Sequence, residues 1–338
     1  MARDVSDTEI VETRADLARW FEVGCKPAGE YRVGAEHEKV PFFKHGLAPV
    51  PYEGANGVDS LLKGMQAKLG WSSIEDGGHL IGLFDEVGKG AISLEPGGQF
   101  ELSGAPCATI HEVRDELDAH LTACHAVAAP LGLGFLTLGM SPKWTRAETP
   151  VMPKSRYAIM ARYMPKVGGH GLDMMFRTAT VQANLDFSSE SDMVAKLRVG
   201  LALQPAITAI YANSPFTDGK LNGFLSARSE IWRHTDPART GMLPFAFEPG
   251  MGFERYADYA LDVPLYFLKR GAAYLDVAGA SFRDLLAGGS ARRRASGRPS
   301  RIGPTTSRPS FRRSGSNAIS RCAAPTSARP TGWWRCRR

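Results

Sequence analysis

The stretch that decides the fold is Ile92-Ser-Leu-Glu-Pro-Gly-Gly-Gln-Phe-Glu-Leu-Ser103. The proline and glycines in its middle predict a tight reversal between two short antiparallel strands. Because side chains alternate between the two faces of a strand, the apolar residues fall on one face and the polar residues on the other. If Glu95 lies opposite Gln99, then Ser93 lies opposite Glu101, and the two carboxylates become diagonal neighbours.

Two other segments alternate polar and apolar residues in the same way. Val33-Gly-Ala-Glu-His-Glu-Lys-Val40 places Glu36 and Glu38 on one face, and residues 179–187 place four polar side chains opposite the apolar ones. These four are Thr180, Gln182, Asn184 and Asp186. The polar faces carry carboxylates and amides with almost no basic residue between them, unlike an ordinary surface sheet. Because magnesium prefers oxygen ligands, the pattern predicts a magnesium-binding face.

The charge of the chain is unevenly distributed. The 338 residues carry a net charge of +6, but 13 of the 41 basic residues and none of the 35 acidic ones lie in residues 287–338. Residues 1–286 therefore hold 28 basic and 35 acidic residues, a net charge of −7. This body is a mildly acidic globular protein, long enough for one large domain or two smaller ones.

The sequence shows neither a membrane span nor a secretory signal. No apolar run reaches the 18 residues that a membrane helix needs, and the first nine residues lack an apolar core. The five cysteines, at positions 25, 107, 124, 322 and 336, have neither metal-site nor disulfide-framework spacing. We therefore expect a reduced, cytoplasmic protein that does not bind a membrane.

Helical periodicity marks three segments between the strands. The expected helices cover residues 7–23, 109–129 and 191–212. The first has a possible capping box from Ser6 to Glu9, and the third contains a run of leucine, isoleucine and alanine at residues 201–210. We expect this run to pack in the core, although Pro205 should kink the helix. Interspersed helices and polar-faced strands predict an α+β fold with an antiparallel sheet.

Six stretches of the sequence together resemble the plant and alphaproteobacterial type of glutamate–cysteine ligase, the enzyme that makes γ-glutamylcysteine in the first step of glutathione synthesis. They occur in the expected order between about residues 5 and 286. The stretches are Val33–Lys39, Ile92–Pro106, Arg156-Tyr through Tyr163–Gly168, Leu172–Met175 through Phe187–Glu190, Ala212–Phe216 with Asn222–Leu225, and Arg239–Phe245 with Tyr259–Pro264.

The resemblance implies a fold and a reaction. The family's fold is related to glutamine synthetase, a curved antiparallel sheet with helices packed on one face, and its concave face holds Mg²⁺, ATP and substrates. The expected reaction is an ATP-dependent ligation. The γ-carboxylate of L-glutamate attacks the γ-phosphate of ATP, and the amino group of L-cysteine then displaces phosphate from the γ-glutamyl phosphate. Such chemistry depends on positioning and on neutralisation of phosphate charge.

The resemblance also suggests residue roles. The expected metal ligands are Glu36, Glu38, Glu95 and Glu101. Gln182 and Asn184 are expected to contact the metal, nucleotide or substrate. Arg177 and Arg228, with Trp232 nearby, are candidates for holding the substrate carboxylate, because arginine binds carboxylates bidentately. Lys166 and Arg239 are candidates for binding phosphates. Taken alone, the glutamates of residues 33–40 also fit a solvated strand face, and Arg228 equally fits a structural ion pair.

The resemblance ends near Leu286. Family members are expected to continue for well over a hundred residues, with a stretch such as Arg-Leu-Lys-Arg-Tyr-Leu-Glu-Met-Arg-Gly-Ala-Asp, whose Glu and Arg belong to the metal and phosphate site. Residues 315–326 can be encoded by bases that spell this stretch when they are read one nucleotide earlier. We therefore hypothesise that a frameshift between about residues 286 and 298 replaced the C-terminal region.

This hypothesis divides the chain in two. Residues 1–286 are expected to be an incomplete glutamate–cysteine ligase catalytic domain, and the chain as written is expected to be inactive. Residues 287–338 are an Arg-rich, low-complexity tail whose composition predicts disorder.

Two other functions remain open. One is a related carboxylate–amine ligase that uses another amine. The other belongs to a different class, a nucleic-acid-binding protein whose Arg-rich tail neutralises phosphates. A shifted reading frame in GC-rich DNA yields the same Arg, Ala, Gly and Pro, which disfavours this reading. The sequence does not predict the oligomeric state.

Overall fold

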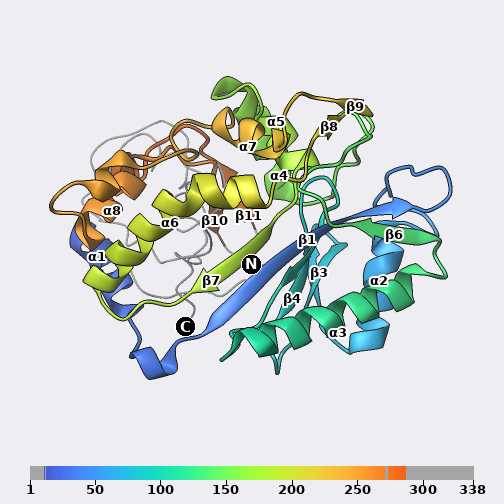
Figure 1. Cartoon of the computed structure of the whole chain (residues 1–338), viewed down its shortest axis with the longest axis horizontal. Coiled ribbons are helices and arrows are strands. Elements are labelled where there is room, and N and C mark those ends of the chain that lie inside the picture. Colours follow the sequence, from blue (N-terminus) through green and yellow to red (C-terminus); the bar gives the residue numbers. More distant parts are fainter. Residues whose placement is uncertain (1–10, 12, 271–272, 287–338) are drawn as a thin grey trace, which may run out of the picture.

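The computed structural model describes residue 11, residues 13–270 and residues 273–286. These residues form a seven-stranded sheet, two small two-stranded sheets and helices of different lengths (Figure 1). Every strand pair in these sheets is antiparallel, which confirms the predicted α+β class. The tail predicted to be disordered, residues 287–338, lies outside the described residues.

The sheet is built around β1 (Val33–Phe43), which pairs with three strands. β5 occupies one edge of β1, whereas β7 and β6 share its other edge, β7 beside the first half and β6 beside the second. The order across the sheet is β2-β3-β4-β5-β1-β6. The strands are β2 (Ser72–Asp76), β3 (His79–Phe84), β4 (Ala91–Leu94), β5 (Phe100–Ser103), β6 (Leu133–Leu136) and β7 (Val181–Leu185).

The hairpin β4–β5 has the predicted register. Ser93 pairs with Glu101, and the backbone N–H of Glu95 donates to the carbonyl of Gln99. The apolar face of the hairpin is buried, with Ile92 and its neighbours in the core. The alternation of the sequence therefore identified both faces correctly.

Two helices, α2 (Val58–Leu69) and α3 (Ile110–Ala128), cover the apolar face of the sheet (Figure 1). The Thr109 side chain caps α3 by accepting from the backbone N–H of Glu112, as the predicted helix start requires. The buried residues that join these helices to the sheet are Leu61, Leu62, Met65, Ala123, Cys124, Ile92, Leu94 and Phe100.

A second core joins α1 (Arg14–Val23), α6 (Glu190–Ile210) and α8 (Phe253–Asp262). The first helix begins later than predicted, because Thr13 and Asp16 form the capping box. The predicted box at residues 6–9 lies outside the described residues. Ser189 caps α6 through the N–H of Asp192, so the third predicted helix begins where expected.

The remaining elements are mostly shorter. They are η1 (Ala28–Glu30), α4 (Ser155–Tyr163), η2 (Met164–Lys166), α5 (Gly171–Arg177), β8 (Phe216–Thr217), β9 (Lys220–Leu221), α7 (Ala227–Arg233), η3 (Pro244–Phe247), β10 (Phe267–Arg270), β11 (Ala273–Asp276) and α9 (Phe282–Leu286). Glycines with positive φ, such as Gly70 after α2, allow several of the turns between elements.

The packing predicted for the apolar run in α6 was wrong. Leu201 is buried, but Leu203, Ile207 and Ile210 are 50%, 44% and 72% exposed. Among the described helices, α6 is long and apolar enough to span a membrane, judged by length and composition, which the sequence analysis did not anticipate. Its buried residues pack in the second core, against α1 and α8. The helix is therefore apolar on more of its surface than the described part of the chain covers.

His120 of α3 is buried between this helix and the sheet. Its ring stacks near Phe100, and its Nε2 lies 3.3 Å from Sγ of Cys124. Burial, together with the positive charge of Lys39, lowers the pKa of His120 to about 2. The imidazole is therefore neutral in the folded protein at physiological pH.

We predict that acid destabilises the fold through His120. An unfolded histidine has a pKa of about 6.5, so the unfolded chain binds one more proton than the folded chain once the pH falls below that value. The expected loss in the free energy of unfolding is about 2 kcal/mol between about pH 6.5 and about pH 5. Urea titrations at the two pH values measure it.

His120→Gln should remove this part of the pH dependence, because glutamine does not titrate. The control His125→Gln, at an exposed position of the same helix, should retain it. An unchanged pH dependence in His120→Gln would contradict the assignment.

Candidate functional site

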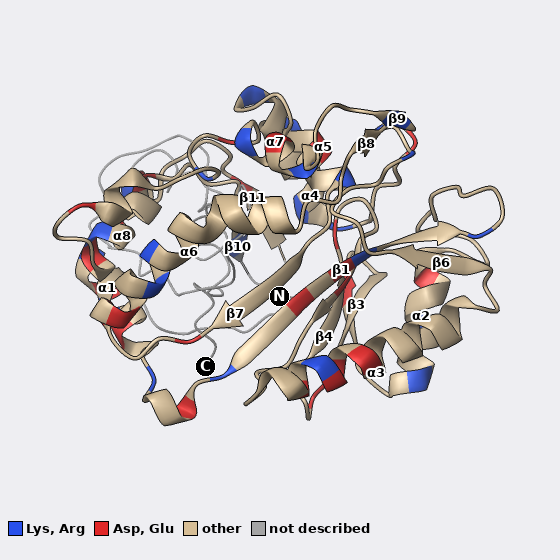
Figure 2. Ribbon diagram, viewed as in Figure 1, with Lys and Arg blue, Asp and Glu red and all other residues tan. Residues whose placement is uncertain are grey.

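The sheet carries an acidic face on the side opposite α2 and α3, formed by β1, β5 and β7 together with β4. Glu38 of β1 is directly paired with Glu101 of β5, and Glu36 lies between Ser103 and Gln182. Figure 2 shows acidic residues along the β1 ribbon in the middle of the molecule. Like charges directly opposite each other destabilise a sheet, so a cation on this face would relieve the pairing.

The carboxylates of this face are held by neighbouring polar groups. Glu101 accepts hydrogen bonds from the hydroxyls of Ser93, at 3.0 Å, and Ser103, at 2.7 Å. Glu38 accepts from the backbone N–H of Thr180 at 3.0 Å. Both glutamates are buried, as is Glu36. Their positions are therefore fixed by the sheet and not by solvent.

The predicted amide residues on β7 reach the same face. The amide of Gln182 donates to Asn184 Oδ1 at 3.1 Å, and the amide of Asn184 lies 3.5 Å from a carboxylate oxygen of Glu36. Gln182 is also the cross-strand partner of Glu36. The structure therefore brings Gln182, Asn184 and Glu36 together, as the three alternating segments predicted.

The turn of the β4–β5 hairpin fixes the place of Glu95. The side chain of Gln99 accepts from the N–H of Gly97 and donates to the carbonyls of Met175 and Thr178. A Cβ at Gly97 would lie only 2.0 Å from the carbonyl oxygen of Phe176, so the turn lies directly against α5. The hairpin and α5 therefore hold the end of the acidic face as one unit.

Sequence reasoning gave no role to two buried cations near Glu95. Nζ of Lys154 donates to the carbonyl of Leu94 at 2.5 Å. Arg156 is 8% exposed; burial alone would lower its pKa, but the nearby Tyr157 and Glu95 raise that pKa above its ordinary value. The available signal was that Arg156 opens one of the six family-like stretches.

A third buried cation, Lys39, lies on the other side of the sheet. Its ammonium donates to the carbonyls of Phe100, at 3.0 Å, and His37, at 3.3 Å. Burial lowers the pKa of Lys39 to about 8, although the negative charges of Glu101 and Glu38 oppose this shift. Lys39 thus places a positive charge within range of the acidic face without occupying it.

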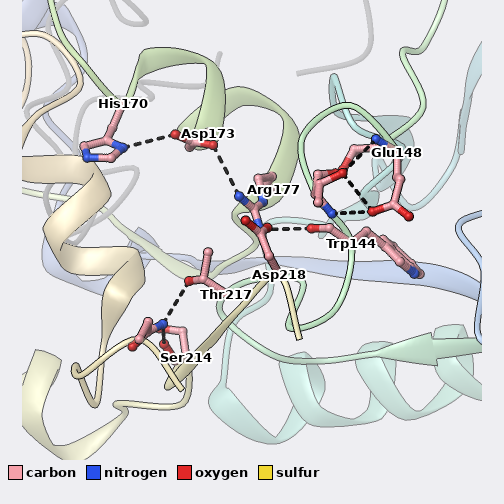
Figure 3. A network of polar contacts seen from close by, with 11 residues as sticks. Trp144, Glu148, His170, Asp173, Arg177, Ser214, Thr217 and Asp218 are labelled. Carbon is pink, nitrogen blue, oxygen red and sulfur yellow. Dashed lines mark hydrogen bonds and ion pairs between the residues drawn. The ribbon is translucent and has the colours of Figure 1, made fainter. Parts of the chain in front are cut away.

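Arg177 takes part in a network of polar contacts through its two terminal nitrogens (Figure 3). Its guanidinium contacts Asp218 at 2.5 Å, Asp173 at 3.5 Å and the carbonyl of Trp144 at 2.9 Å. Asp173 in turn lies 3.0 Å from Nδ1 of His170. These contacts tie α5 to the loop before β9, so the geometry favours a structural ion pair over the predicted substrate contact.

The remaining predicted residues lie in three places. Nε of Arg228 donates to the carbonyl of Ala179 just before β7, and its guanidinium lies 5.5 Å from the centre of the Trp232 ring. Arg239 is buried, pairs with Asp236 and stacks 3.8 Å from the centre of the Tyr266 ring. Lys166 is exposed on η2. Arg228 and Trp232 therefore form a cation–π pair next to the strand that bears Gln182.

The donor set of the acidic face is suited to magnesium. Carboxylate and amide oxygens are the hard ligands that Mg²⁺ prefers, and the pairing of Glu38 with Glu101 favours a cation between them. Among the described residues, no three His, Cys, Asp or Glu side chains are gathered into a group that could hold a metal ion. Glu36 and Glu38 lie on β1, Glu101 on β5 and Glu95 in the turn after β4, so the structure does not gather the four predicted ligands into one cluster, and they fit the ion by the chemistry of their oxygens alone.

Comparisons with known proteins place the chain among glutamate–cysteine ligases. The sequence model of glutamate-cysteine ligase family 2 (GCS2) matches residues 32–314. The chain is 55% identical over 276 residues to the chloroplastic glutamate–cysteine ligase of Medicago truncatula, and 55% identical over 276 residues to that of Arabidopsis thaliana. It is 53% identical over 276 residues to glutamate–cysteine ligase A, chloroplastic, of Oryza sativa subsp. japonica.

These alignments cover 82% of this chain but 53%, 52% and 55% of the three relatives. The chain therefore spans about half the length of the curated relatives that it matches. The relatives also contradict the predicted cytoplasmic location, because each of them is named as a chloroplastic enzyme. The prediction relied on the absence of an apolar signal sequence. Plastid transit peptides are not apolar, so this absence does not distinguish a cytoplasmic protein from a plastid protein.

We predict that Gly97→Ala disturbs the acidic face from its end. The added methyl group meets a backbone carbonyl of α5, which cannot move aside as a flexible side chain could, so the turn must shift. The expected loss of stability is about 2 kcal/mol. Gly29→Ala is the matched control, because a Cβ there meets nothing within 4 Å. Thermal unfolding of both variants measures the difference, and equal effects would refute the contact.

Proposed function

Because the chain belongs to glutamate-cysteine ligase family 2, we propose that the complete protein joins the γ-carboxylate of L-glutamate to the amino group of L-cysteine, with ATP and Mg²⁺. This would be the first step of glutathione biosynthesis. The observation that carries the proposal is the acidic face, where Glu38 and Glu101 are paired across two strands in a protein 55% identical to named ligases.

The proposed ligands of Mg²⁺ are Glu36, Glu38, Glu95 and Glu101. When bound, the ion neutralises phosphate charge, which is the main requirement of phosphoryl transfer. The protein's own contribution is to hold these oxygens in place. Ser93 and Ser103 fix both oxygens of Glu101. A fixed carboxylate needs little reorganisation when the ion and the phosphates arrive.

The other predicted residues have proposed roles beside this face. Gln182 and Asn184 would contact the metal, the nucleotide or the substrate, since the Asn184 amide lies beside Glu36 and the Gln182 amide donates to Asn184. Arg228, supported by Trp232, would hold the substrate carboxylate. A direct substrate role for Arg177 would require it to release Asp218.

We propose phosphate-binding roles for Lys166 and Arg239 on the family resemblance alone. Arg239 would have to leave Asp236, or bind phosphate with its remaining nitrogen atoms. Another amine as second substrate remains the alternative, and the names of the relatives favour cysteine.

We also propose that residues 287–338 are a shifted reading frame, so that residues 1–286 are an incomplete catalytic domain. The support is the change in composition and the back-reading of residues 315–326. The family match runs to residue 314, so the composition alone does not locate the shift. The competing interpretation is that these arginines form an arm that binds nucleic acid. A salt-dependent DNA-binding assay on chains with and without residues 287–338 separates the two interpretations.

One prediction of the proposed function concerns metal binding. Glu101→Gln should weaken Mg²⁺ or Mn²⁺ binding at least tenfold, because it removes one charge from the paired carboxylates while keeping their shape. Isothermal titration of the whole chain measures the affinity. Glu53→Gln, at an exposed position away from the sheet, is the control and should bind as the parent does. Equal affinities in the two variants would remove Glu101 from the site.

Another prediction of the proposed function concerns activity. DNA sequencing across the codons for residues 286–298 should find an insertion or deletion relative to related genes. A gene with the frame restored should encode a chain that releases ADP when glutamate, cysteine and ATP are present, whereas the chain as written should show little or none. An appreciable rate of γ-glutamylcysteine formation by the chain as written would overturn the requirement for the missing region. ADP release with another amine in place of cysteine would favour the alternative ligase.

A further inference from the structure

An uncovered apolar stripe runs along α6. Val199, Leu203, Ile207 and Ile210 are 55%, 50%, 44% and 72% exposed. At about 100° per residue they fall within an arc of roughly 80° on one side of the helix. The charged residues of α6 lie in its first half, and no charged residue follows Arg198 before the helix ends (Figure 2).

The strand that leads into α6 carries a second uncovered row. Val181 and Leu185 of β7 are 66% and 40% exposed, and Ala183 between them is exposed. Val181 pairs with His37, which alternates with Glu36 and Glu38 along β1, so this row lies on the side of the sheet that α2 and α3 cover. In Figure 1, β7 lies between α6 and α3 with no described helix drawn across it.

Exposed apolar rows of this kind usually mark a surface that another chain segment covers. The stripe on α6 has the period of a helix that packs against a second helix, and the row on β7 has the period of a sheet face. The two rows belong to one strand–helix unit, since only residues 186–189 separate β7 from α6. A single covering segment would bury both.

The length of the relatives indicates the occupant. The chain aligns with only 53% of the Medicago truncatula enzyme. The described chain ends at Leu286, which packs against the same core cluster as Leu197 and Leu201 of α6. A polypeptide that continues from this point starts beside the opposite face of α6 and needs only to pass around the helix to reach the stripe.

We propose that the α6 stripe and the β7 row are the docking surface for the C-terminal region that follows the matched segment in the full-length ligases. This region would be an amphipathic segment whose apolar side covers Leu203, Ile207 and the outer side of β7. The surface is distinct from the acidic face, because Val181 and Leu185 alternate with Gln182 and Asn184 along β7.

The test compares the accessibility of α6 with and without that region. Leu203→Cys is introduced into the chain as written and into a chimera, in which residues 1–286 continue into the C-terminal region of the Medicago truncatula enzyme. Labelling by a thiol reagent, located by peptide mass, should be at least tenfold slower in the chimera. Val87→Cys, at a position that is 90% exposed between β3 and β4, is the control and should react equally in both.

Three results would overturn the proposal. Equal labelling of Leu203→Cys in both chains shows that the C-terminal region lies elsewhere. Protection in the chain as written that disappears on dilution shows that a second copy covers the stripe. Protection that requires added phospholipid vesicles shows that a membrane covers it, consistent with the length and composition of α6.

A second measurement tests the proposal if the chimera does not fold. The position aligned with Leu203 is changed to cysteine in the full-length Medicago truncatula enzyme, where rapid labelling of the active enzyme also overturns the proposal. Ligase activity of the chimera is assayed separately. An active chimera with an exposed Leu203→Cys would refute the docking surface and leave the proposed function standing.

Discussion

The arrangement depends on one constraint, the cross-strand register that sets Glu38 of β1 opposite Glu101 of β5. A shift of β5 by one residue would send Glu101 into the apolar core and bring Phe100 to the acidic face. Burial of Phe100 and Leu102 on the apolar face of the sheet therefore fixes the site as firmly as any contact within it. The stability of the core and the position of the candidate ligands are two results of the same pairing.

The sequence predicted the two faces of the sheet because alternation along a strand is a local property. The register of the β4–β5 hairpin followed as well, since Pro96-Gly97-Gly98 leaves few ways to close the turn. Contacts between distant segments were not predictable in this way. Nothing near Arg177 in the sequence indicates that Asp218 takes its guanidinium, because a hairpin that is remote in sequence brings the aspartate there.

The failure at α6 has a different cause. Helical periodicity shows that a residue lies on an apolar side of a helix, but it does not show whether any segment covers that side. Leu201 and Leu203 belong to the same run, yet the first is 1% and the second 50% exposed. The buried side contacts η3 and belongs to the same core cluster as α1 and α8, all supplied by the described chain, whereas Leu203, Ile207 and Ile210 on the other side are exposed.

The two sides of β7 connect these findings. Gln182 and Asn184 face the candidate site, while Val181 and Leu185 face away from it and are exposed. Among the described strands, β7 pairs only with β1, so one of its edges and much of one of its faces lack the packing that restrains the central strands. A segment that covered the apolar row would restrain β7 and therefore the amides beside Glu36. The region that follows residue 286 in full-length relatives would then support the site in two ways, through residues of its own and by holding β7 in place.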